Sequence, residues 1–124
     1  MDDHWREQDG HAPLTGAQAA DVVRRRIDHG MLETWFKHDR GRLLAVVSNG
    51  TRALIMLLEE PGDPGEHAID PTGTGQQDGF VLSNGQHDAC SDRDSVPLVQ
   101  ALAIVEHIVD HGHLPASLAW HVDR

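Results

Sequence analysis

The sequence lacks the segments and residue pairs that would place it in a membrane or an oxidising compartment. Its longest uninterrupted apolar run, Ala53 to Leu58, has the length of one strand, whereas crossing a bilayer needs ~20 residues. The first residues are acidic and lack the basic and apolar regions of a secretory signal peptide. Cys90 is the single cysteine, so no internal disulfide can form. These absences predict a soluble, cytoplasmic protein without membrane contact.

Basic residues are also scarce. Ten Lys and Arg stand against 20 Asp and Glu, which gives a formal net charge of −10. A negative field repels phosphate backbones, so nucleic acid is excluded as a partner. The imbalance is concentrated in residues 59–94, where nine acids accompany a single base, Arg93. This segment is either a solvated acidic surface or a docking face for a basic partner.

Catalytic motifs are missing from the chain. The run Gly73-Thr74-Gly75 has no following Gly-Lys-Ser/Thr and does not open a predicted helix, so it is not a phosphate-binding loop. Cys90 lies near His87, but no orienting or oxyanion-binding group can be assigned to the pair. Adjacent carboxylates such as Glu59-Glu60 point to opposite faces of a strand. The sequence therefore predicts a non-catalytic protein without a cofactor.

The histidines near the C-terminus are the only candidate metal ligands. His107 and His111 stand four residues apart, which places both rings on one face of a helix, and His113 follows. Both rings point away from the apolar stripe of that helix, toward water. We expect no metal, although a small histidine-dependent metalloprotein stays open as an alternative.

Helix signals divide the chain of 124 residues into a flexible polar lead-in over 1–14 and a single α+β domain over 15–124. A capping box, Thr15 to Gln18, predicts a helix over 16–29 that ends at Gly30. Apolar residues at helical spacing predict a second helix over 97–111, with Pro97 near its start and Gly112 after its end.

Strand signals fill the remainder of the domain. Runs of apolar and β-branched residues predict strands over 31–37, 42–48, 51–59, 67–69, 79–83, 86–90 and 117–122. Asn49-Gly50 and Asn84-Gly85 predict hairpins with type I′ turns, in which both central residues have positive φ. The order α-β-β-β-(β)-β-β-α-β predicts an α+β fold with an antiparallel sheet of about five to six strands and two packed helices.

The expected core follows from the same patterns. The strand over 51–59 is apolar on both faces, so we expect it to be central and covered on each side. The residues predicted to lie in the core are Leu54, Met56, Leu102, Val105 and Trp120.

A family resemblance is carried by residues 79–121. The run Gly79-Phe80-Val81-Leu82-Ser83-Asn84-Gly85-Gln86-His87-Asp88 is followed by Asp94-Ser95-Val96-Pro97, the helix, Gly112-His113-Leu114-Pro115 and Ala119-Trp120. This order resembles the immunity-protein family numbered first among those of bacterial polymorphic toxin systems. The resemblance implies architectural roles for the motif residues Asn84, Gly85, Pro97, Gly112, Pro115 and Trp120.

The resemblance also implies a function. Members of the family are cytoplasmic antidotes that bind and block a toxin, often one with a nucleic-acid deaminase domain, and such an enzyme presents a basic surface. We therefore expect a basic toxin partner. The expected partner-binding residues are Glu59, Glu60, Asp63, Glu66, Asp70, Asp78, Gln86, Asp88, Asp92 and Asp94. An accessory protein-binding module of a biosynthetic or secretion enzyme is the alternative, and the gene neighbourhood separates the two.

Overall fold

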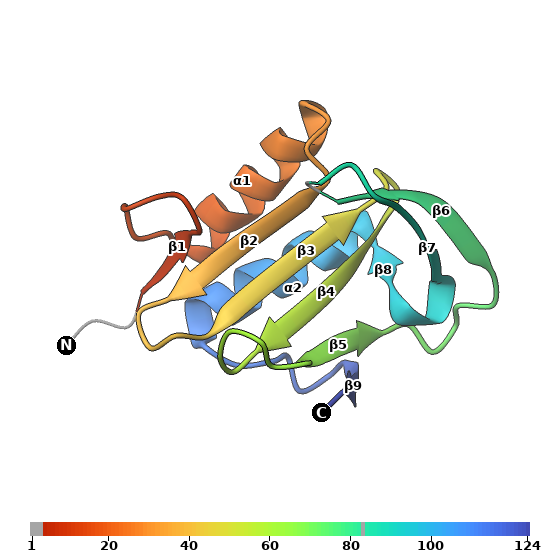
Figure 1. The fold of residues 1–124 in the computed structure, drawn as a ribbon. Coiled ribbons are helices and arrows are strands. Elements are labelled where there is room, and N and C mark those ends of the chain that lie inside the picture. The colour runs from red at the N-terminus through yellow and green to blue at the C-terminus, as the bar shows by residue number, and fades with distance from the viewer. Residues whose placement is uncertain (1–3, 83) are drawn as a thin grey trace.

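The computed structural model describes residues 4–82 and 84–124, and its fold is α+β (Figure 1). Two helices accompany a mostly antiparallel sheet, as the element order predicted. The elements are β1 (Trp5–Glu7), α1 (Gly16–Asp28), β2 (Glu33–His38), β3 (Leu43–Ser48), β4 (Arg52–Leu58), β5 (Glu66–Ile69), β6 (Gln76–Val81), β7 (His87–Ser91), the 3₁₀ turn η1 (Asp92–Asp94), β8 (Val96–Pro97), α2 (Leu98–His111) and β9 (Ala119–Val122).

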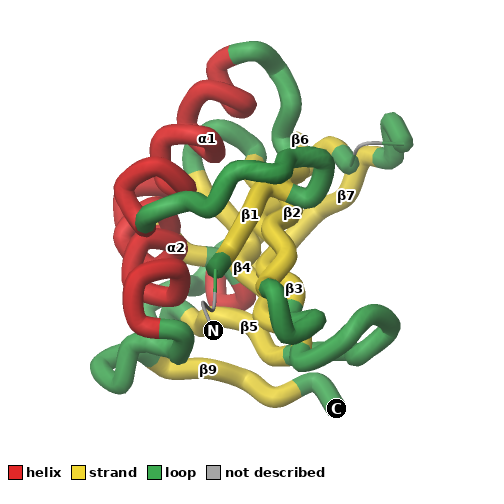
Figure 2. The backbone as a smooth tube through the Cα atoms, turned by 90° about the vertical axis from the view of Figure 1, so that its left-hand side faces the viewer, coloured by secondary structure: helices red, strands yellow, loops and turns green. Residues whose placement is uncertain are grey.

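The main sheet has the strand order β1-β2-β3-β4-β5-β9, and β8 adds a short pairing to β4. Strands β6 and β7 form a separate two-stranded hairpin. Both helices lie on one side of the main sheet, and the hairpin rises on the other (Figure 2). Within the described residues, neither helix combines the length and apolarity that a membrane span requires.

Helix α1 begins and ends where the sequence predicted. The Thr15 hydroxyl accepts from the Gln18 backbone N–H at 3.2 Å, and the Gln18 side chain accepts from the Thr15 N–H at 2.9 Å. At the other end the Met31 N–H donates to the Arg26 carbonyl at 2.8 Å. Gly30 lies between them with a φ of 78°. A glycine in the left-handed region is the usual end of a helix, because it lets the chain turn back onto the last carbonyls.

Helix α2 also matches its prediction within one residue. Pro97 comes immediately before the helix and pairs with Arg52 in the β4–β8 register. Gly112 ends the helix in the left-handed conformation and donates its N–H to the Ile108 carbonyl at 2.7 Å.

The core fills the space between the helices and one face of the sheet. Its largest fully buried side chains include Phe36, Leu44 and Ile55 from the strands and Ile104 and Ile108 from α2. Val105 is buried as predicted. Leu102 and Trp120 are partly buried and pack against the core rather than within it.

The prediction that Leu54 and Met56 lie in this core is wrong. Side chains alternate along a strand, and on β4 the residues facing the helices are Ala53, Ile55 and Leu57, which are buried. Leu54 and Met56 therefore point to the opposite face, where they stay partly exposed. The helices cover β4 on one face only, in contrast to the expected cover on both.

Of the lead-in expected over residues 1–14, residues 1–3 lie outside the described residues, and residues 4–14 are attached to the sheet. Trp5 begins edge strand β1, which pairs with β2, and its side chain is 2% exposed. The Leu14 N–H donates to the Trp5 carbonyl at 2.9 Å and so folds the intervening loop back onto the strand. One large aromatic ring holds this segment in place, and a single residue leaves no periodic signal in the sequence.

Both predicted hairpins form, but the type I′ turns are wrong. Outside residues 1–3 and 83, positive φ occurs only at glycines, including Gly50 (91°) and Gly85 (88°). The Asn49 side chain accepts from the backbone N–H of Thr51 and Arg52 at 3.0 and 2.8 Å. The Asn84 side chain accepts likewise, from the N–H of Gln86 at 2.9 Å. Each asparagine supports its turn through its side chain, and only the glycine takes the left-handed conformation.

Candidate functional site

The acidic residues of the 59–94 segment fall into two groups, and the first group is held by internal cations. Arg52, 13% exposed, donates from Nη2 to the Asp70 carboxylate at 2.8 Å and to the Asp92 carbonyl at 2.7 Å. Its Nε donates to the Ser95 hydroxyl at 2.9 Å. The Arg52 hydrogen bond holds the pKa of Asp70 below its ordinary value. This network joins β4 to the ends of β5 and η1.

A second internal cation is supplied by the C-terminal residue. Arg124 donates to the Asp63 carboxylate through Nε at 3.1 Å and Nη2 at 2.9 Å, and it lies 3.6 Å from Glu66. The hydrogen bond from Arg124 is the main reason that the pKa of Asp63 falls to about 2. Asp63 also accepts from the Glu59 backbone N–H at 2.9 Å. Asp63 in the β4–β5 loop and Glu66 at the start of β5 therefore both pair with Arg124.

The third internal partner of these acids is His67 on β5. Its Nε2 lies 2.9 Å from Asp94 Oδ1 and its Nδ1 lies 2.7 Å from Asp123 Oδ2. A neutral imidazole has one N–H, so both bonds exist only when the ring is protonated and donates from each nitrogen. Burial lowers the pKa of His67, but the two carboxylates outweigh that effect and raise it. His67 thus joins η1 to the residue that follows β9, and the two carboxylates favour its protonated form.

The second group of acids is exposed. Glu60, Asp78 and Asp88 form no ion pair within the part of the chain that the structure describes. Asp88 accepts only a hydrogen bond from the exposed Gln86, at 3.0 Å, and Glu59 lies 3.6 Å from Arg42. Half of the predicted partner-binding residues are therefore available to a partner: Glu59, Glu60, Asp78, Gln86 and Asp88. The other half stabilise the fold: Asp63, Glu66, Asp70, Asp92 and Asp94.

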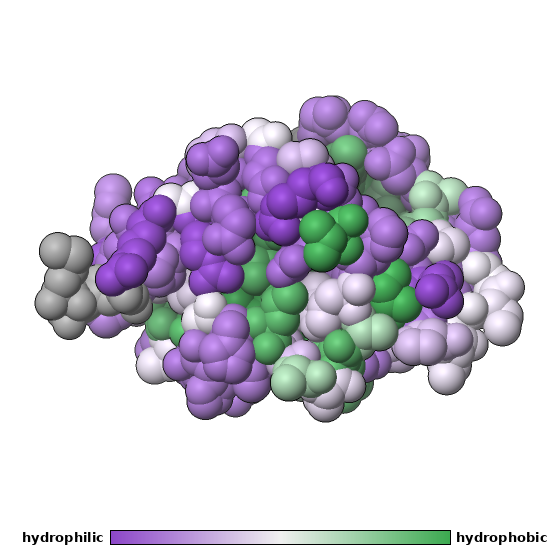
Figure 3. Space-filling model, turned by 90° about the horizontal axis from the view of Figure 1, so that it is seen from below, coloured by the Kyte–Doolittle hydropathy of each residue, from purple (hydrophilic) through white to green (hydrophobic). Residues whose placement is uncertain are grey.

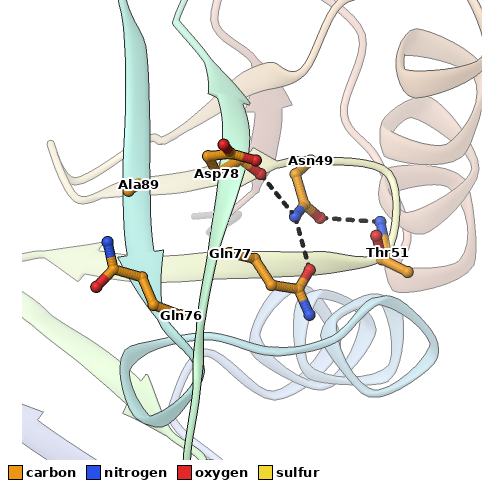
Figure 4. A pocket seen from close by; sticks show the side chains of 6 residues that line it. All are labelled: Asn49, Thr51, Gln76, Gln77, Asp78 and Ala89. Carbon is orange, nitrogen blue, oxygen red and sulfur yellow. Dashed lines mark hydrogen bonds between the residues drawn. The ribbon is translucent and has the colours of Figure 1, made fainter.

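The exposed group is carried largely by the β6–β7 hairpin, which Asn49 fastens to the sheet. Its side-chain amide donates to Gln77 Oε1 at 2.9 Å and to the Asp78 carbonyl at 3.1 Å (Figure 4). The pairing slips between Gln77 and Phe80, so Asp78 lies in a bulge of β6. A shallow depression of about 630 Å³ lies at this junction and has a polar lining that includes Gln76 and Thr51. Amides and a carboxylate that face water favour polar contacts with another molecule.

The histidines of the C-terminal region come together in space. The ring of His107 lies 4.5 Å from that of His111 and 5.3 Å from that of His113, centroid to centroid. Desolvation and the two neighbouring rings lower the pKa of His107, which favours its neutral form. Among the described residues, however, no three histidine, cysteine or acidic side chains are arranged to hold a metal ion.

The motif residues lie at junctions between elements. Asn84 and Gly85 form the end of the β6–β7 hairpin, and Pro97 and Gly112 flank α2. Pro115 is buried in the connection to β9, and Trp120 packs against the core from β9. Burial, followed by the charge of Asp94, raises the pKa of the Cys90 thiol, so its reactive thiolate is disfavoured.

Sequence reasoning missed Arg52, Arg124 and His67, the three basic side chains that pair with the acids. Arg52 stands at the start of an apolar strand and Arg124 at the end of the chain, and neither position carries a motif. His67 is one of ten histidines. The signal that could have found Arg52 is the excess of acids in 59–94, because acids buried on folding require a cation nearby.

The fold and the site together define an α+β domain with one helix-covered sheet face and a projecting acidic hairpin. No family model matches the chain, and no curated protein matches it.

Proposed function

We propose that this chain is an immunity protein that binds a basic bacterial toxin domain of the nucleic-acid deaminase type and neutralises it. The observation that carries the proposal is that the acidic residues of 59–94 fall into a paired group and an unpaired, exposed group. Several carboxylates are paired inside the fold, whereas Glu60, Asp78 and Asp88 are exposed without an ion pair in the described chain. The resemblance of residues 79–121 to immunity proteins supports the same function.

Unpaired charges of one sign repel each other in the free protein and attract a partner of opposite sign over several ångströms. An enzyme that acts on nucleic acid must present a basic surface to the phosphates. An acidic protein that covers this surface competes with the substrate and blocks the enzyme.

The first test is genetic. The C-terminal domain of the protein encoded beside this chain is expressed in a bacterial host, alone and together with this chain. We expect growth arrest in the first case and growth in the second, together with a complex that survives gel filtration. Growth arrest that co-expression does not relieve contradicts the proposal.

The second test measures association and dissociation rates of that complex at two ionic strengths. Reversing Glu60, Asp78 and Asp88 to Lys should lower the association rate at low salt by about tenfold or more, with a smaller effect on dissociation. The control reverses Asp9, Asp28 and Glu106, which are exposed elsewhere and give the same change in net charge. Equal effects of the two triple variants would mean that overall charge, and not this surface, guides the partner.

A further inference from the structure

The face of the main sheet that points away from the helices is lined with apolar side chains. The register places Trp35 of β2 beside Ala45 of β3, and Ala45 beside Met56 of β4. Val47 pairs with Leu54 in the same way. We call this surface the open sheet face. Its apolar members are Trp35, Leu43, Ala45, Val47, Leu54, Met56 and Leu58.

This face is only partly covered. Neither of the two helices that the structure describes lies over it (Figure 2). Strand β6 contacts β3, and the β6 residue Phe80 is 2% exposed although it is not part of the core beneath the helices. Trp35, Leu54 and Met56 retain exposed surface. Ala45, Val47 and Leu58 of this face are buried. The apolar patch that stays uncovered is of the kind that often marks a binding surface.

Exposed carboxylates lie at both ends of the strands that form this face. At one end, the β3–β4 turn is bonded to the hairpin that carries Asp78 and Asp88. At the other end, β4 finishes at Leu58 and leads directly into Glu59 and Glu60. An apolar centre with a charged rim is the usual anatomy of a protein–protein interface.

We propose that the open sheet face binds the apolar part of a basic protein surface, with Leu54 and Met56 as its anchor residues. This inference rests on the proposed function and assigns the place where the toxin domain binds. Apolar anchors supply most of the energy of such interfaces, while charges at the rim steer the approach. The exposed carboxylates guide a basic partner, and the apolar centre retains it.

The charge of the chain also argues against other molecules as the binding partner of the open sheet face. A second copy of this chain is disfavoured because each copy has a formal net charge of −10, and like charges at an interface are costly. Anionic lipid headgroups are repelled for the same reason. Seen from the β9 end, the molecule shows several apolar patches among hydrophilic and near-neutral residues (Figure 3).

The test uses two synthetic peptides as probes, one in which Lys and Leu alternate and one with Glu in place of Lys. Each is titrated into the isotope-labelled chain while backbone amide signals are recorded. We expect the Lys peptide to shift the amides of β2, β3 and β4 around Trp35, Leu54 and Met56. Shifts confined to another surface, such as the groove at Met31, overturn the proposal. Equal binding of the Glu peptide overturns its electrostatic part.

Substitutions on the open sheet face measure how much this face contributes to the binding energy. The double variant Leu54→Thr, Met56→Thr keeps residues that favour strands and should bind the Lys peptide at least tenfold more weakly. Val99→Thr is the matched control, because Val99 is 84% exposed on α2 and lies outside the open sheet face, and its affinity should be unchanged. Thermal unfolding verifies the fold, and Met56→Thr alone replaces the double variant if that variant unfolds. Unchanged affinity of a folded variant overturns the proposal.

The same variants separate this inference from the proposed function. In the toxin complex, the double variant should speed dissociation, whereas reversal of Glu60, Asp78 and Asp88 should slow association. If only the charge reversal has an effect, the immunity function is supported, but the toxin domain does not bind through the open sheet face. If the Lys peptide binds the open sheet face but no toxin is neutralised, the binding surface is supported and the immunity function is contradicted.

Discussion

The backbone N–H of Gly16, at the start of α1, donates a 2.7 Å hydrogen bond to the carboxylate of Asp110 in the last turn of α2. The first N–H groups of a helix have no partner within the helix, so α2 supplies one of them. The contact also requires the two helices to approach closely. A Cβ on Gly16 would lie 2.4 Å from the Glu106 carbonyl oxygen.

We therefore expect Gly16→Ala to destabilise the protein. The added methyl group has to push the two helices apart, which costs about 1–3 kcal/mol in tightly packed positions. Urea denaturation of the variant and wild type measures the difference in the free energy of unfolding. The control is Gly10→Ala, whose Cβ would come no closer than 3.4 Å to its neighbours. An equally small effect of both substitutions would contradict the close contact.

Local signals in the sequence were sufficient for the helices and for the hairpins. The Thr15–Gln18 capping box and the left-handed Gly30 depend only on neighbouring residues, so their outcome is visible in the sequence. Local signals did not show which face of strand β4 enters the core. Residues 53–58 are apolar on both faces, and only the position of the helices decides that Ile55 enters the core while Met56 does not.

On α2, the cost of truncating an apolar side chain should depend on how deeply that side chain is buried. Ile104 is 2% exposed within the core, whereas Leu102 is partly exposed at its margin. Ile104→Ala should lower the free energy of unfolding by about 2–5 kcal/mol, the usual range for removing a buried branched side chain. Leu102→Ala should cost less, because water already contacts part of this side chain. Denaturant titrations of both variants decide, and a larger loss for Leu102→Ala would contradict the packing described.

The candidate site was less predictable than the fold, because charge counts do not reveal pairing. The excess of acids in 59–94 is evident from composition. Which of these acids are unpaired depends on three basic side chains, Arg52, Arg124 and His67, that are distant in sequence and adjacent in the fold. Arg52 lies 18 residues from Asp70 in sequence, and Arg124 lies 61 residues from Asp63. Contacts of that separation follow from topology and have no local signature.

The link between His67, Asp94 and Asp123 makes stability depend on pH in a defined direction. The pKa of His67 is raised in the folded protein above the value of about 6.5 for an unfolded chain. The folded state therefore binds this proton more tightly, and the stabilisation is complete below about pH 6.5. It is lost as the pH rises through the folded pKa, because the neutral ring can donate to only one of the two carboxylates.

The same link also weakens at acidic pH, for a different reason. The hydrogen bonds from His67 and then from Ser91 lower the pKa of Asp94, so its contribution is present above its ordinary pKa of about 3.9 and disappears as the pH falls below that range. His121 lies beside this link, with its ring 5.4 Å from that of His67 and its Nε2 3.7 Å from the Asp123 carboxylate. The largest benefit from His67 is thus expected between about pH 4 and pH 6.5.

The variant His67→Gln measures this benefit, since glutamine keeps a hydrogen-bond donor but cannot become a cation. We expect the difference in unfolding free energy between wild type and variant to be largest between about pH 4 and pH 6.5 and to shrink toward alkaline pH. Titration of the His67 ring by NMR gives the folded pKa, and the difference should decline at that same pH. His87→Gln is the control, because His87 is exposed on β7 and forms no ion pair in the described chain. A difference that is constant, or that grows with rising pH, would show that His67 does not act as a cation between the two carboxylates.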